Sequence, residues 1–193
     1  MHRPVLVTPP AILPISVAEV KQALHIDAAD DDVVIEREIR AAVAHYEGWT
    51  GILGICLVEQ TWRQDFDNFD CLRLPLGPVI PPVVAVRWRN TAGQIATINA
   101  SEYSLQTDGA GRSFLRFRNG YTRPSDLYET GAVQVEYKAG WPVVEGASTV
   151  PDDIRTAIIF RVQLAYDEAA KTGGEHLARA ENALISKYRR FSI

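Results

Sequence analysis

The spacing of apolar residues separates helical segments near both ends of the chain from an alternating, strand-like middle. The clearest helix lies within residues 33–51, where apolar positions recur at i, i+4, i+7, i+8 and i+11. These positions are Ile35, Ile39, Ala42, Val43 and Tyr46. Gly48 and Gly51 follow and end the helix, because glycine readily leaves the helical conformation.

Residues 1–15 contain four prolines and predict an extended arm, because each proline biases its predecessor away from helix. Ser16 and Glu19 then form a capping-box pattern that predicts a short helix over 16–25. Four acids come next, namely Asp27, Asp30, Asp31 and Asp32. A calcium loop would need alternating acids and a central glycine, so N-capping of the following helix and pairing with its dipole are the better interpretation.

The middle of the chain reads as short strands separated by turns. Within 56–66, Val58, Trp62 and Phe66 share one face of a strand, and polar residues occupy the other face. The further predicted strands are 72–74, 83–89, 94–98, 103–106, 114–117 and 132–138. Six or seven short strands at this spacing predict an antiparallel sheet folded into a small sandwich or barrel.

Helical spacing returns near residue 149, where Thr149 is the expected cap, Pro151 lies in the first turn and acids follow. The apolar stripe of this helix is Ile154, Ala157, Ile158, Val162, Ala165 and Ala169. Gly173 and Gly174 end it. A last helix over about 175–190 carries Leu177, Ala180, Leu184 and Tyr188 on one face.

This order predicts an α+β fold, with a four-helix bundle built from both chain ends and an inserted antiparallel β module. The expected parts are an extended arm (1–15), the N-terminal bundle helices (16–52), the β module (56–140) and the C-terminal bundle helices with a tail (149–193). The chain has 193 residues and 47% apolar residues, which suits one domain with a compact insertion.

The formal charge of −4 gives no general attraction to nucleic acid, so binding to DNA would require a local basic patch. The sequence shows neither a signal peptide nor a membrane span, and cytoplasmic synthesis is expected. Cys56 and Cys71 flank a predicted strand pair, so the two side chains could face each other. Two separate reduced thiols are the simpler interpretation.

Candidate reactive groups do not form a recognisable site in the sequence. The histidines His2, His25, His45 and His176 are scattered, so we expect no metal, no cofactor and no catalytic residue. The segment from Gly109 to Arg112 superficially resembles a phosphate loop, but no helix follows it, and a hairpin turn is predicted. The tryptophans Trp49, Trp62, Trp88 and Trp141 are expected to pack in cores and at edges.

The C-terminal segment is basic and aromatic. The simpler interpretation is a frayed helix end whose cations match the helix dipole. The functional interpretation is a docking peptide, because tyrosine, arginine and phenylalanine anchor many protein interfaces. The docking candidates are Lys187, Tyr188, Arg189, Arg190, Phe191 and Ile193.

A series of motifs over about residues 16–170 resembles the phage head–tail connector (adaptor) family, which also occurs in gene transfer agents. The helix ends in Tyr46, Glu47, Thr50 and Gly51, and the next strand carries Gln60-Thr61-Trp62. The later matches are the stretch from Leu72 to Val79, the strand 83–88, Tyr103, the stretch from Val135 to Trp141, and the stretch from Val150 to Ile158.

This resemblance implies a structural subunit of a ring, usually twelvefold, located in the neck of a virion or particle. The implied partners are other copies of the chain, the portal protein and tail-side connector or stopper proteins. DNA would pass through the ring without sequence-specific binding, and the C-terminal segment would engage the portal. Ring closure by a heterologous interface needs no active site.

Two other functions stay open on the sequence. The chain could be another virion structural protein, such as a tail terminator or a capsid-associated protein. It could also be a small-molecule binding or enzymatic module, in which Val58, Trp62 and Trp88 would line a cleft.

Overall fold

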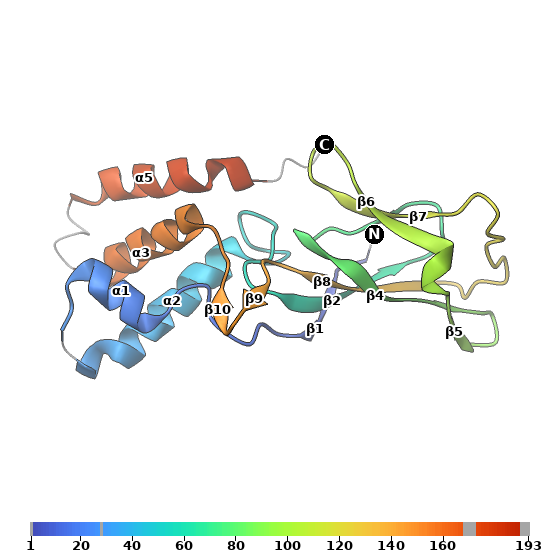
Figure 1. Ribbon diagram of the computed structural model, residues 1–193, viewed down its shortest axis with the longest axis horizontal. Coiled ribbons are helices and arrows are strands. Elements are labelled where there is room, and N and C mark those ends of the chain that lie inside the picture. Colours follow the sequence, from blue (N-terminus) through green and yellow to red (C-terminus); the bar gives the residue numbers. More distant parts are fainter. Residues whose placement is uncertain (1, 28, 168–172, 190–193) are drawn as a thin grey trace. The chain divides into compact units, whose positions relative to one another are not determined.

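The computed structural model describes residues 2–27, 29–167 and 173–189, and it contains two compact units (Figure 1). The β unit consists of Met1–Ala11 and Glu59–Gly140. The helical unit consists of Ile12–Val58 and Trp141–Ile193. The coarse prediction of a mixed α+β fold with antiparallel sheets is therefore confirmed.

Segments from both sides of the β insertion build the helical unit. Its α-helices are α1 (Val17–Leu24), α2 (Asp32–Tyr46), α3 (Asp152–Tyr166) and α5 (Glu175–Ile185). Its 3-10 turns are η1 (Ala29–Asp31) and η3 (Ser186–Tyr188), and its two-stranded ribbon is β9 (Val143–Val144) with β10 (Ala147–Ser148). The capping box of Ser16 and Glu19 forms at the start of α1 as predicted.

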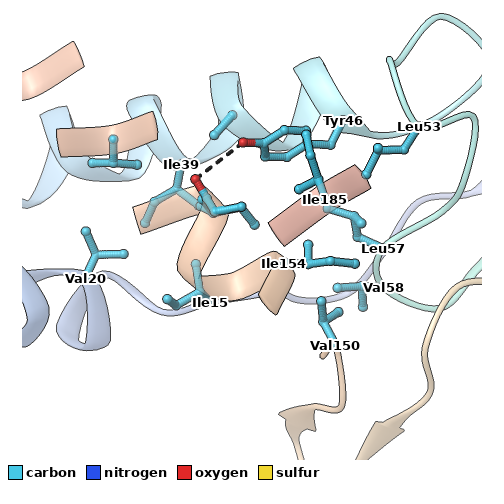
Figure 2. Packing of buried hydrophobic residues seen from close by; sticks show 14 of the residues in the cluster. Ile15, Val20, Ile39, Tyr46, Leu53, Leu57, Val58, Val150, Ile154 and Ile185 are labelled. Atoms are coloured by element: carbon cyan, nitrogen blue, oxygen red, sulfur yellow. Dashed lines mark hydrogen bonds between the residues drawn. The ribbon is translucent and has the colours of Figure 1, made fainter. Parts of the chain in front are cut away.

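One apolar core joins these helices (Figure 2). Its fully buried side chains include Val20 from α1, Ile35 and Ile39 from α2, Ile154 and Ile158 from α3, and Ile185 from α5. Each such side chain contributes roughly 1.5–3 kcal/mol by leaving water. The apolar stripes predicted near the two chain ends therefore meet in one core, with α3 packed against the other three helices.

A buried polar cluster fixes α5 to the rest of this core. The hydroxyl of Tyr46 donates to Oε1 of Glu181 at 2.5 Å and lies 3.3 Å from the carbonyl oxygen of Ala157. Arg161 of α3 binds the same Oε1 at 3.1 Å. Burial, together with the adjacent carboxylate of Glu181, raises the pKa of the Tyr46 hydroxyl, which keeps it a donor.

The buried face of α5 is displaced from the predicted one. Glu181 and Ile185 are its buried residues, whereas Ala180 and Leu184 are only partly buried. The periodicity could not select Glu181, because a glutamate in a predicted apolar face counts against burial unless its partners are known. Two partners from elsewhere in the unit, Tyr46 and Arg161, make its burial possible.

The β unit contains two antiparallel sheets. The five-stranded sheet has the order β1 (Val5–Thr8), β2 (Gln60–Phe66), β8 (Val133–Ala139), β4 (Val79–Arg89) and β5 (Ile95–Thr97). The three-stranded sheet has the order β3 (Leu72–Arg73), β7 (Ser113–Phe117) and β6 (Tyr103–Thr107), and the 3-10 turn η2 (Ala100–Glu102) precedes β6. Most predicted strands therefore exist, and β1 is a strand within the segment that was expected only to be extended.

Two local predictions are wrong. Val58 does not share a face with Trp62, because it packs in the helical core and bridges to Trp141. Thr149 does not cap α3, since its hydroxyl donates to the carbonyl oxygen of Pro142 at 2.7 Å. The residue before α3 is Pro151, whose carbonyl oxygen accepts the first backbone bonds of the helix.

Removing the Tyr46 hydroxyl should destabilise the protein by about 2 kcal/mol, because Tyr46→Phe leaves the buried carboxylate of Glu181 short of a donor. Chemical denaturation monitored by circular dichroism measures this change. The matched control is Tyr166→Phe, since Tyr166 also donates to a carboxylate, Asp31 at 2.7 Å, but at a half-buried position. The control should lose less than about 1 kcal/mol, and equal losses would contradict the assigned role of Glu181.

Candidate interaction site at the C-terminal segment

The docking segment predicted from the sequence is described only at its base. Lys187, Tyr188 and Arg189 follow α5, and the first two lie in the turn η3. Arg190, Phe191 and Ile193 lie outside the described residues. The geometry of the site is therefore that of its base, which the following contacts hold.

The base of the segment is attached to the first turn of α3. Lys187 forms an ion pair with Asp153, and the hydroxyl of Tyr188 lies 3.4 Å from the same carboxylate. The ring of Tyr188 meets Trp141 edge to face, with centroids 6.1 Å apart, and it packs against the helical core. Arg189 donates to Oδ1 of Asn182 at 2.7 Å. Lys187 and Tyr188 therefore both have partners in the helical unit.

Electrostatics favour this attachment around neutral pH. The hydrogen bond from Lys187 lowers the pKa of Asp153 below its usual value of 3.8. The same bond raises the pKa of Lys187 above 10.5. Since one pKa is depressed and the other is raised, the pair is fully charged between these two values. The attachment weakens only when acid protonates Asp153 or strong base deprotonates Lys187.

Replacing Asp153 with asparagine should loosen the segment without unfolding the protein, because the ion pair is solvent-exposed and contributes little stability. Backbone relaxation of residues 186–189 by NMR should show increased mobility in Asp153→Asn. In the unmodified protein the same mobility should appear only as the pH falls below 3.8, through the depressed pKa of Asp153.

The adjacent residue supplies the control. Asp152 pairs with Arg155 at 3.1 Å, and this pair does not involve the C-terminal segment. Asp152→Asn should therefore leave residues 186–189 as ordered as they are in the unmodified protein. Unchanged order in Asp153→Asn would show that the contacts of Tyr188 and Arg189 hold the segment without the ion pair.

The acidic cluster before α2 does not cap the helix through a side chain, but Asp32 lies in the first turn, where the predicted pairing with the helix dipole requires an acid. Asp31 occupies the N-cap position, but its backbone is already helical and its carboxylate accepts from Tyr166. Asp32 pairs with Lys21 of α1 at 2.6 Å. The cluster therefore connects the start of α2 to neighbouring helices. Within the described residues, no group of three potential metal ligands occurs.

The glycine-containing turn between β6 and β7 is the predicted hairpin. The carboxylate of Asp108 accepts the backbone amides of Ala110 and Arg112, each at 3.0 Å, and the side chains of Arg112 and Arg73. The amide of Arg112 contributes most to lowering the pKa of Asp108 to about 2. The loop amides thus bind an internal carboxylate in the place where a phosphate loop would bind its anion.

The remaining sequence candidates do not converge. Cys56 is buried in the helical unit, Cys71 is exposed in the β unit, and neither is in a disulfide. Of the residues suggested for an enzymatic cleft, Val58 belongs to the helical core, and Trp62 and Trp88 are strand residues of the β unit. Among the helices that the structure describes, none is long and apolar enough for a bilayer crossing.

Sequence reasoning missed a basic notch of about 310 Å³ beside β7. Arg73, Arg116 and Arg123 line it, and two of them approach aromatic rings, Arg73 over Phe114 and Arg123 over Phe117. The overall charge hid this feature. The helical unit contains ten basic and fifteen acidic residues, whereas the β unit contains ten basic and nine acidic residues.

Comparison with solved structures identifies where this fold occurs. A chain in "Neck of empty GTA particle computed with C6 symmetry" matches with a TM-score of 0.75 and 24% identity, covering 100% of this chain and 97% of the other. The fold is shared over the whole chain. A chain in "Virion of native gene transfer agent (GTA) particle" matches with the same TM-score and coverage at 23% identity.

A third chain, from "Neck of native GTA particle computed with C12 symmetry", has a TM-score of 0.68 and 25% identity over the same coverage. These neighbours agree with the resemblance that the sequence motifs carry. No protein-family model and no curated protein matches the sequence.

Proposed function

We propose that this chain is a structural subunit of a particle neck, and more specifically a head–tail connector between portal and tail. The observation that carries the proposal is the fold shared over the whole chain with subunits of gene transfer agent necks. The order of sequence motifs supports the same function independently of the coordinates. The protein then acts through shape and association, and we assign it no catalytic residue and no cofactor.

The subunit would work as a member of a closed ring, with twelve copies as the resemblance implies. Two of the matching chains come from necks computed with C6 and C12 symmetry, and cyclic symmetry requires each subunit to contact its neighbours through two different surfaces. In this arrangement the helices α1, α2, α3 and α5 serve as a four-helix bundle that carries the β unit as an insertion. DNA would pass through the ring without sequence-specific contacts.

The C-terminal segment is the proposed contact with the portal. Its base is held by Asp153 of α3 and by Trp141, which precedes β9, so the last described residue of the segment, Arg189, has a defined place on the helical unit. Arg190, Phe191 and Ile193 provide a cation and two apolar side chains of the kinds that anchor interfaces. Tail-side connector or stopper proteins would bind elsewhere on the ring, and assembly would follow synthesis in the bacterial host cytoplasm.

Electron microscopy of the purified protein, alone and mixed with its portal protein, tests the proposal. We expect rings, and we expect them to occupy one end of the portal in the mixture. A protein that stays monomeric and never binds portal would overturn the connector function. Cross-linking in particles to capsid or tail-terminator proteins instead of portal would support the other virion functions.

Truncating the last four residues should separate docking from folding. Without residues 190–193 the protein should keep its stability and its rings, because the described contacts of Lys187 and Tyr188 persist. It should lose attachment to portal, because the proposed anchoring residues are gone. Sedimentation with purified portal measures the attachment.

A longer truncation is the comparison. Without residues 187–193 the protein should also lose roughly 1–3 kcal/mol of stability, because Tyr188 packs against the helical core. Portal attachment that survives the loss of residues 190–193 would contradict the docking role of the segment.

A further inference from the structure

The loop after α2 exposes two large apolar side chains. Trp49 and Ile52 are each 43% exposed, although they belong to a loop whose other apolar residues are buried. Tryptophan is among the residues that contribute most often to binding at protein interfaces. We call this pair the apolar knob (Trp49 and Ile52).

The loop that carries the knob is closely held by hydrogen bonds. Its backbone bonds join Gly48 to Ile55 at 2.7 Å, Ile52 to His45 at 2.9 Å and Leu53 to Tyr46 at 3.2 Å. The carboxylate of Glu47 accepts the amide of Leu57 at 2.6 Å. A Cβ on Gly51 would lie 2.2 Å from the carbonyl oxygen of Glu47, so the loop also fits tightly on itself. Binding through the knob would therefore require little ordering of the loop.

A groove lined mainly by apolar residues lies elsewhere on the same unit, between α2 and α3. It has a volume of about 340 Å³, near the lower end of pockets that hold small ligands. Its lining residues are Glu38, Ala41, Ala42, Arg161, Leu164 and Ala165. The three alanines allow an incoming ring to approach the helix backbones closely, and the two charged residues supply polar partners.

The chemistry of the groove suits an indole. A buried indole N–H needs an acceptor, and a guanidinium group stacks favourably on the ring. Glu38 binds Arg37 through Oε1, and no described residue is bonded to its Oε2. Arg161 is held by Glu181 through Nη1, yet 36% of its side chain is exposed. The groove therefore offers one acceptor and one oriented cation around an apolar floor.

We propose that the apolar knob of one copy docks into the groove between α2 and α3 of the next copy. The knob and the groove are different surfaces of the same chain, so their contact is heterologous and can be repeated around a ring. A second copy is favoured over another partner because the chain carries both complementary surfaces. The inference rests on the proposed ring function and identifies the surfaces that would close the ring.

Two pairs of variants test the contact, with sedimentation velocity and mass photometry as readouts. Ala41→Gln fills the groove, and its control Ala44→Gln makes the same change at an exposed position of α2 outside the groove. Trp49→Ala removes the knob, and its control Val33→Ala trims another exposed apolar side chain. We expect Ala41→Gln and Trp49→Ala to weaken self-association roughly 30-fold, and the controls to leave it unchanged.

Disulfide trapping gives a second readout that detects weak contact. With Cys71→Ser as background, protein carrying Trp49→Cys should cross-link to protein carrying Ala41→Cys when the two are mixed and oxidised. Protein carrying both changes should give a ladder of covalent oligomers. Cross-linking in the mixture and loss of association in the two groove and knob variants would establish the contact.

The failures of the two proposals differ. Rings that form equally well in Ala41→Gln and Trp49→Ala, together with no cross-link between positions 49 and 41, would overturn the knob-and-groove contact. The connector function would survive that result. A chain that neither forms rings nor binds portal would remove the connector function, whereas a cross-link between positions 49 and 41 would still identify these two surfaces as a self-association contact.

Discussion

The helical unit depends on one constraint, which is that its core is completed only when the two ends of the chain meet. Ile35 and Ile39 come from before the β insertion, and Ile154 and Ile158 come from after it. The hydrogen bond between Tyr46 and Glu181 also joins a residue before the β insertion to one after it. It lies in the buried core, where an unpaired carboxylate would be costly. Apolar burial therefore holds the helices together, and the polar cluster determines which face of α5 packs into the core.

The spacing of apolar residues and the choice of turn and capping residues predicted most helices and strands, because both are properties of short stretches of sequence. The apolar stripe of α2 and the capping box at Ser16 each depend on a few residues close together in the sequence, and both exist as expected. Errors arose where a non-local partner decided the outcome. In the sequence, Val58 continues the apolar–polar alternation of the strand that contains Trp62. In the structure it forms a bridge to Trp141 and belongs to the helical unit.

The interaction surfaces were less accessible to sequence reasoning than the fold. Residues such as Arg73 and Arg116 are far apart in sequence, and only the pairing of β3 with β7 brings them to one notch. The exposure of Trp49 was equally hidden, because tryptophan is buried on average and a core position was the natural expectation. The composition of the C-terminal segment predicts a docking peptide, whereas the attachment of its base to Asp153 depends on how α5 packs against α3.

The bridge between Val58 and Trp141, with the amide of Trp141 bonded to Leu57 at 2.9 Å, has a consequence for how such chains can diversify. It holds the residues just before and just after the inserted segment side by side. The helical unit therefore keeps the same attachment points whatever segment lies between them. A different insert of any length could be grafted at this junction, provided that the first eleven residues, which complete the present sheet, are exchanged along with it.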